Sequence, residues 1–76
     1  MKALVEYLVK SLVTQPEEVI LAERENEENL FLELKVNQED MGRIIGRDGS
    51  TINAIRTVLQ AAAASHKKRV RLDVLS

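Results

Sequence analysis

The chain of 76 residues has no cysteine, no tryptophan, one histidine and two other aromatic residues, and each scarcity excludes a class of protein. Without cysteine there can be no disulfide framework, thiolate metal site or thiol nucleophile. The single histidine, His66, excludes a metal site built on two histidines. With Tyr7 and Phe31 as the only aromatic residues, we expect no stacking platform of the RRM or OB type, in which several rings hold bases. The sequence therefore predicts no metal, no cofactor and no enzymatic activity.

Long apolar runs are also absent. No apolar stretch is long enough to span a bilayer, and Glu6 interrupts the first one, so neither a membrane helix nor a signal peptide is expected. The chain is too short for two ordinary domains, and a core of this size buries only about 60% of the surface of the unfolded chain. We expect a single small domain over residues 1–76, in the cytoplasm, with no membrane partner.

The net charge of −1 conceals an uneven distribution of charge along the chain. Residues 1–40 carry four basic and ten acidic side chains, whereas residues 41–76 carry seven basic and two acidic ones. A basic half favours a polyanionic partner. The alternative is that the two halves pair with each other across one fold, since surfaces of mixed sign are usual in small domains.

The hydrophobic periodicity predicts an α+β fold. Apolar residues at helical spacing indicate an amphipathic helix over 2–13, which ends before Pro16. Two apolar stretches, 19–22 and 30–36, flank a polar turn and are typical of an antiparallel hairpin. We expect Asn37 to cap a short helix that runs to Ile45.

A break at 46–49 separates this short helix from a second one over 50–66, and an alternating strand follows from 69 to 74. The predicted order is therefore α-β-β-α-α-β. The link between the second and third strands is long enough for a parallel crossover. We expect a three-stranded mixed sheet with three helices on one face and solvent on the other.

The break contains the stretch with the clearest chemical meaning. Gly46 and Gly49 stand three residues apart, and glycine tolerates positive φ and lets another backbone approach closely. The following helix begins here, and the amides of a helix N-terminus favour phosphate. Arg47 at the tip and Arg43 one turn upstream add positive charge. The pattern suits a sugar-phosphate backbone, although a plain corner between two helices is the alternative.

The joint context resembles a KH domain, in which a GxxG loop clamps about four nucleotides of single-stranded nucleic acid. The motif is I-G-x-x-G with Ile52 three residues on, and the extra helix and strand precede it, as in the type II arrangement. Segments 4–13, 16–19, 42–46 and 68–75 resemble the small bacterial single-KH family known as KhpA. The resemblance implies RNA binding in the cytoplasm, in post-transcriptional regulation or as an RNA chaperone. It also implies homodimers, and heterodimers with a larger KH-containing protein of the Jag type.

The resemblance also indicates which residues would contact RNA. These are Gly42, Arg43, Ile45, Gly46, Arg47, Asp48, Gly49, Ser50, Ile52 and Asn53. Many KH domains carry further basic residues in these places, where this chain has Asp48, Ser50 and Asn53. Fewer cations neutralise fewer phosphates, so we expect weak RNA affinity from one protomer.

Several of these residues have a second interpretation. Arg43 can pair with Glu39 instead of phosphate, and Ile45 can pack in the core instead of lining a groove for bases. For Ile52, core packing is the preferred interpretation. Asp48 is expected to cap the next helix by accepting a backbone N–H. Gly42 lies inside a short helix, where glycine costs about 1 kcal/mol relative to alanine, which favours a close approach of ligand or strand.

Outside the motif, the structural interpretations are preferred. We expect Arg69 and Arg71 to point outward from a strand and pair with acids such as Glu33. Tyr7 is expected to be partly buried, and an RNA-backbone contact by Arg56 is not favoured. The alternative function is a protein-interaction module whose fold serves dimerisation, because the four alanines at 61–64 permit close contact between helices.

Overall fold

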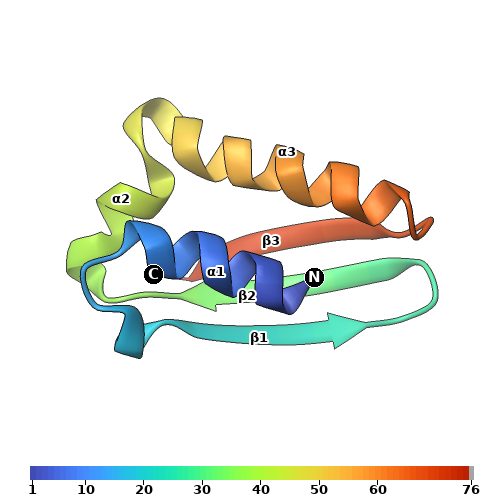
Figure 1. Ribbon diagram of the computed structural model, residues 1–76, viewed down its shortest axis with the longest axis horizontal. Helices are drawn as coiled ribbons and strands as arrows, with labels where there is room; N and C mark the ends of the chain where they lie inside the picture. Colours follow the sequence, from blue (N-terminus) through green and yellow to red (C-terminus); the bar gives the residue numbers. More distant parts are fainter. Residues whose placement is uncertain (76) are drawn as a thin grey trace.

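Helices and strands follow the predicted order α-β-β-α-α-β in a computed structural model that describes residues 1–75 (Figure 1). The α-helices are α1 (Lys2–Leu12), α2 (Met41–Ile45) and α3 (Ser50–Ala64). The strands are β1 (Ile20–Glu25), β2 (Asn29–Lys35) and β3 (Arg69–Leu75). Three single turns of 3-10 helix lie between them: η1 (Pro16–Glu18), η2 (Gln38–Asp40) and η3 (Arg47–Gly49).

The sheet has the strand order β1-β2-β3, with β2 in the centre. β1 pairs antiparallel with β2, and β3 pairs parallel with β2 through partners such as Leu32 and Leu72. One face of this sheet is buried against the helices, and Figure 1 shows α1 lying over the sheet and α3 running alongside β3. The predicted mixed sheet with helices on a single face is therefore confirmed.

The core lies between β2 and the helices. The side chains of Leu32 and Leu34 from β2, Val9 from α1 and Leu59 from α3 are fully buried. Each such side chain contributes about 1.5–3 kcal/mol relative to an exposed one. Phe31, on the same strand as Leu32, points the other way, to the open face of the sheet. The period-two alternation therefore predicted both faces of β2 correctly.

Three boundaries differ from the prediction by two or more residues. The helix predicted from Gln38 to Ile45 divides into η2 and α2, so α2 itself starts at Met41. β1 continues to Glu25 instead of ending near residue 22, because cross-strand pairing with β2 persists through its charged end. The tight turn that follows is closed by Asn26, whose Oδ1 accepts N–H bonds from Glu28 at 2.9 Å and Asn29 at 2.7 Å. α3 ends at Ala64 instead of His66, and the chain then turns through Lys67 at φ +57°.

The expectation for Tyr7 is wrong, because its side chain is 72% exposed. The buried residues of α1 are Val5 and Val9, so only one narrow face of the helix packs against the rest of the protein. An aromatic residue outside that face therefore lies in solvent. The cap predicted at Asn37 is confirmed, since its Oδ1 accepts the N–H of Glu39 at 2.8 Å, where it starts η2.

Asp40 is a fully buried carboxylate at the start of α2. It accepts hydrogen bonds from Thr14 N and Thr14 Oγ1, both at 2.9 Å, and from Gln15 N at 3.1 Å. The backbone N–H of Thr14, above all, holds the pKa of Asp40 below its usual 3.8, against the opposing effect of burial. A buried charge is tolerated only with such partners. The carboxylate thus ties the segment after α1 to the beginning of α2.

Candidate nucleic-acid interface

The corner between α2 and α3 begins at Gly46, whose backbone requires glycine. Its φ of 74° and ψ of 179° lie in a region that is essentially limited to glycine. A Cβ built at Gly46 would lie 2.7 Å from the Cβ of Thr51 and 2.7 Å from its backbone nitrogen. Both the conformation and the close approach of α3 therefore exclude a side chain here.

Two further residues of the corner are left-handed. Asp48 has φ 54° and ψ 29°, and Gly49 has φ 79° and ψ 10°. Aspartate is one of the few residues other than glycine that visits this region readily. Three of the four residues from Gly46 to Gly49 thus have positive φ, which folds the loop into a tight, exposed turn.

The expectation that Asp48 caps α3 is wrong. Gly49 occupies the N-cap position, and no side chain makes a capping hydrogen bond to α3. Asp48 stands one residue too early, in a left-handed turn that presents it to solvent. The Ser50 amide donates to the Arg47 carbonyl within the corner, but no side chain caps the helix, and the positive end of α3 favours an anion there.

Two arginines flank this corner. Arg47 is exposed at the tip and makes no ion pair with any of the residues 1–75. Arg43 lies one turn earlier, with its Nε 3.7 Å from Asp40 Oδ1 and its side chain 60% exposed. The pairing of Arg43 with Glu39 is therefore wrong, and its acidic neighbour is the buried Asp40. Most of the Arg43 side chain still faces solvent beside the corner.

The small and polar residues of the site line its surface. Gly42 is exposed, and a Cβ placed on it would meet no atom within 4 Å. A close approach of a strand is therefore not the reason for this glycine, and the space beside it is free for a ligand. Ser50 and Asn53 are exposed on the first turn of α3.

The three isoleucines divide between surface and core. Ile44 is fully buried, and Ile52 is only 4% exposed. Ile52 thus takes the core position that was preferred for it from the sequence, where it supports the corner from beneath. Ile45 is half-buried and packs against the edge of the core, so part of its side chain is accessible beside the glycines.

A shallow hollow lies between α3 and the edge strand β3. Arg56 donates from Nε and Nη2 to the Leu72 carbonyl at 3.2 and 2.9 Å, and Gln60 Nε2 donates to the Val70 carbonyl at 2.8 Å. Arg71 and Asp73 complete its lining. Arg56 is thus used in holding β3 to α3. The sequence analysis did not identify Gln60 as a residue that contacts β3. Its position four residues after Arg56, on the same face of α3, was the available signal.

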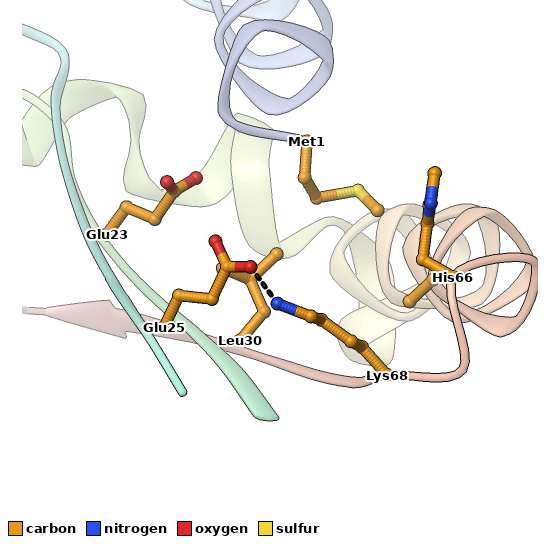
Figure 2. Close-up of a pocket in the computed structure, with 7 residues that line it drawn as sticks. Met1, Glu23, Glu25, Leu30, His66 and Lys68 are labelled. Atoms are coloured by element: carbon orange, nitrogen blue, oxygen red, sulfur yellow. Dashed lines mark hydrogen bonds and ion pairs between the residues drawn. The ribbon is translucent and has the colours of Figure 1, made fainter. Parts of the chain in front are cut away.

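Much of the remaining positive charge is paired away from this corner. Figure 2 shows Lys68 pointing toward Glu25 in a hollow beyond the C-terminal end of α3, where the two side chains form an ion pair. Arg71 Nε lies 3.3 Å from a carboxylate oxygen of Asp73, and Arg24 Nη2 lies 3.3 Å from Glu33 Oε1. The predicted pairing of Arg71 with Glu33 is therefore wrong in its partner.

A protein-family model for the KhpA/KhpB KH domain matches residues 2–74. The chain belongs to the KhpA/KhpB family of KH domains. This membership confirms the resemblance read from the GxxG motif and its flanking segments. It also confirms the expectation of a protein that is not an enzyme, because KH domains are binding modules.

Curated members of the KhpA/KhpB family match over nearly their full length, and those compared here are named RNA-binding protein KhpA. The Halalkalibacterium halodurans protein is 44% identical over 75 residues, covering 99% of each chain. The Clostridium perfringens protein is 49% identical over 75 residues, covering 99% of this chain and all of the relative. The Borreliella burgdorferi protein is 50% identical over 72 residues, covering 95% and 88%. No solved structure matches this chain.

Two other kinds of site receive no support from the structure of this family member. Residues 1–75 contain no group of three or more histidine, aspartate or glutamate side chains placed to hold a metal ion. In the same part of the chain, no helix has the length and apolar character needed to cross a membrane.

Proposed function

We propose that this chain binds single-stranded RNA, without catalysis, at the corner between α2 and α3. The observation that carries the proposal is the turn at Gly46, Asp48 and Gly49, joined to the N-terminus of α3, which no side chain caps, and to Arg47, which forms no ion pair within residues 1–75. An RNA backbone supplies phosphates that this helix N-terminus and Arg47 can bind. The relatives named RNA-binding protein KhpA give independent support.

Each site residue has a role in this proposal. Gly42, Gly46 and Gly49 leave room for the sugar-phosphate backbone, and Arg43 and Arg47 contact phosphates. Ser50 and Asn53 offer hydrogen-bonding groups on the first turn of α3, and the accessible part of Ile45 offers an apolar contact to a base. Asp48 shapes the turn, and Ile52 supports it from the core.

The proposal includes a single KH domain over residues 1–76 that acts in the cytoplasm, in post-transcriptional regulation or as an RNA chaperone. Only Arg43 and Arg47 bring positive charge to the corner, so the affinity of one protomer is low and falls gently with salt. Pairing of two protomers, or of this chain with a larger KH-containing protein of the Jag type, would raise the affinity by linking two weak sites.

A second candidate function is protein interaction, and exposed apolar side chains on the helices favour it. Tyr7 on α1 is 72% exposed, and Val58 on α3 is 47% exposed. Among the alanines at 61–64, Ala63 is buried in the core, so Ala61, Ala62 and Ala64 remain for a neighbouring helix. Sedimentation of the pure protein with and without RNA separates the two functions. A stable dimer that never binds RNA would favour the second.

Gly49→Asp, with Gly49→Asn as its matched control, tests the RNA site. At Gly49 a Cβ would lie 3.5 Å from Asn53 Nδ2, which is an ordinary contact, and both replacements tolerate left-handed backbone. The two variants differ by one negative charge beside the expected phosphate, which corresponds to about 1 kcal/mol, or roughly fivefold in affinity. We expect Gly49→Asp to bind a single-stranded oligonucleotide that much more weakly than Gly49→Asn.

The position of binding is measured separately, by the NMR shifts of backbone amides on adding RNA. Shifts concentrated in residues 42–53 of the unmodified protein are the expected result. Equal affinities of the two folded Gly49 variants, together with shifts elsewhere, would refute the assignment of this corner as the RNA site.

A further inference from the structure

The open face of the sheet carries a row of three side chains that crosses all three strands. In the strand register, Phe31 on β2 stands opposite Arg24 on β1 and opposite Arg71 on β3. Phe31 is 37% exposed, and the side chains of Arg24 and Arg71 are 77% and 71% exposed. An accessible aromatic ring is thus flanked on both sides by guanidinium groups, on the face that no helix covers.

The charge of this face is positive, although the whole chain carries −1. Its basic residues are Arg24, Lys35, Arg69 and Arg71, and its acidic residues are Glu33 and Asp73. The two acids stand opposite each other in the strand register, two residues along the strands from Phe31 and Arg71. Each is paired with an arginine at 3.3 Å. The row of Phe31 contains no acid, and Glu25 and Glu28 lie beside it at the hairpin end, so the positive charge of this face is centred on Arg24 and Arg71.

The open face is continuous with the hollow between α3 and β3. Arg71 and Asp73 line that hollow and also belong to the open face, because β3 is the edge strand. Arg56, which contacts β3 at Leu72, lies about 9 Å along α3 from Ser50, within the reach of the four nucleotides that a KH loop holds. An RNA strand that leaves the hollow and crosses β3 reaches Phe31 on the neighbouring strand β2, about 5 Å away.

We propose that this face is a second contact for the same RNA strand, with a base stacked on Phe31 and phosphates on Arg24 and Arg71. The inference rests on the proposed RNA site at the α2–α3 corner and extends its footprint. Stacking on an aromatic ring is tolerant of base identity, because every base has a π-face. The ion pairs with Glu33 and Asp73 are exposed and contribute little, so phosphates can replace them.

Binding of two labelled single-stranded RNAs, about 4 and about 12 nucleotides long, tests the inference by fluorescence anisotropy at low salt. Only the longer RNA can occupy both the corner and the open face. We expect Phe31→Leu to weaken the longer RNA about tenfold and to leave the shorter one unchanged. Phe31→Tyr keeps the ring and should bind both as the unmodified protein does. Arg71→Gln should act in the same direction as Phe31→Leu, with a smaller effect.

The same measurements separate this inference from the proposed RNA site. Gly49→Asp should weaken both RNAs, because it acts on the shared corner. If Gly49→Asp weakens both while Phe31→Leu weakens neither, the second contact is refuted and the RNA site stands. Unchanged binding by Gly49→Asp refutes the RNA site itself.

The principal competing occupant of the open face is another protein molecule. If Phe31→Leu changes the sedimentation of the protein without RNA, and leaves the affinity for the longer RNA unchanged, the face belongs to that protein and the inference is overturned. Circular dichroism melting of Phe31→Leu gives the folding control. Should it melt early, Arg71→Gln, at an exposed position, provides the decisive affinity comparison.

Discussion

The two ends of α2 differ in burial, in hydrogen bonding and in backbone conformation, although they are only a few residues apart. At its beginning, Asp40 is fully buried and accepts three hydrogen bonds from Thr14 and Gln15. At its end, the turn from Gly46 to Gly49 is accessible, has positive φ at three residues and leaves α3 uncapped. One end is held by hydrogen bonds to a buried side chain, whereas the helix that starts at the other end has no side-chain cap.

This contrast explains how so short a helix can present the proposed binding site. Five residues are too few for a helix that is stable by itself in water. Asp40 fixes the start of α2 to the segment after α1, so the position of the glycine turn is set from the anchored end. Arg43 belongs to both ends, because its Nε lies near Asp40 while most of its side chain is exposed. The anchor therefore orients a group that serves the open end.

Gly46→Ala should give the largest loss of stability. It would remove the contrast between the two ends of α2 by disrupting the glycine turn. Backbone strain alone costs roughly 1–3 kcal/mol, and the contact with Thr51 adds to this cost. A chain of 76 residues has roughly 4–11 kcal/mol of total stability, so the loss is a large part of it. Urea unfolding measures the change. A folded variant of unchanged stability would contradict the glycine requirement at this turn.

Asp40→Asn should have the next largest effect on stability, because it replaces the charged acceptor at the anchored end. The folded-state pKa of Asp40 is lowered, so its contribution is present above pH 3.8 and is lost as pH falls through the folded value. Thermal melting from pH 7 to pH 2 should show this acid-induced loss in the unmodified protein and a smaller one in Asp40→Asn. Asp48→Asn, at an exposed position, is the control and should melt like the unmodified protein. Identical pH profiles for Asp40→Asn and the unmodified protein would exclude the anchor role.

Gly42→Ala should give the smallest change in stability. It sharpens the contrast between the two ends of α2, because it separates an effect on stability from an effect on RNA binding. Alanine gains up to about 1 kcal/mol in a helix, and its Cβ meets no protein atom here. We expect a variant that is as stable as the unmodified protein or more so, with weaker RNA binding. Ala61→Gly in α3, far from the corner, should lose stability and keep its RNA affinity. Gly42→Ala with undiminished RNA affinity would show that RNA does not approach this residue.

The sequence predicted the elements whose signal is local. Val5 and Val9 at helical spacing indicated α1, and the alternation of Leu32 and Leu34 with Phe31 indicated β2 and its two faces. The charged end of β1 was missed, because pairing with β2 extends the strand where its own residues do not favour one. Local periodicity carries no information on such a contribution from a neighbouring strand.

The candidate site could be located from the sequence, but its internal contacts could not. Gly46 and Gly49 marked the corner, since few other residues permit positive φ. The partner of Arg43 was missed because the burial of Asp40 depends on Thr14, 26 residues earlier in the chain. Asp48 has the residue type of a helix cap, yet the left-handed turn leaves the cap position to Gly49. The partner of Arg43 and the cap of α3 depend on which residues the fold brings together, and this is not visible in the local sequence.

The parallel pairing of β2 with β3 has a consequence for the order in which the domain folds. Each partner pair, from Asn29 with Arg69 to Lys35 with Leu75, is separated by 40 residues, whereas the partners in the β1–β2 hairpin are 5 to 15 residues apart. The hairpin can form early, but closing the larger loop costs more chain entropy and slows folding. Both helices of the glycine corner lie within that loop. The segment that we propose to bind RNA thus lies inside the loop whose closure limits how quickly the sheet is completed.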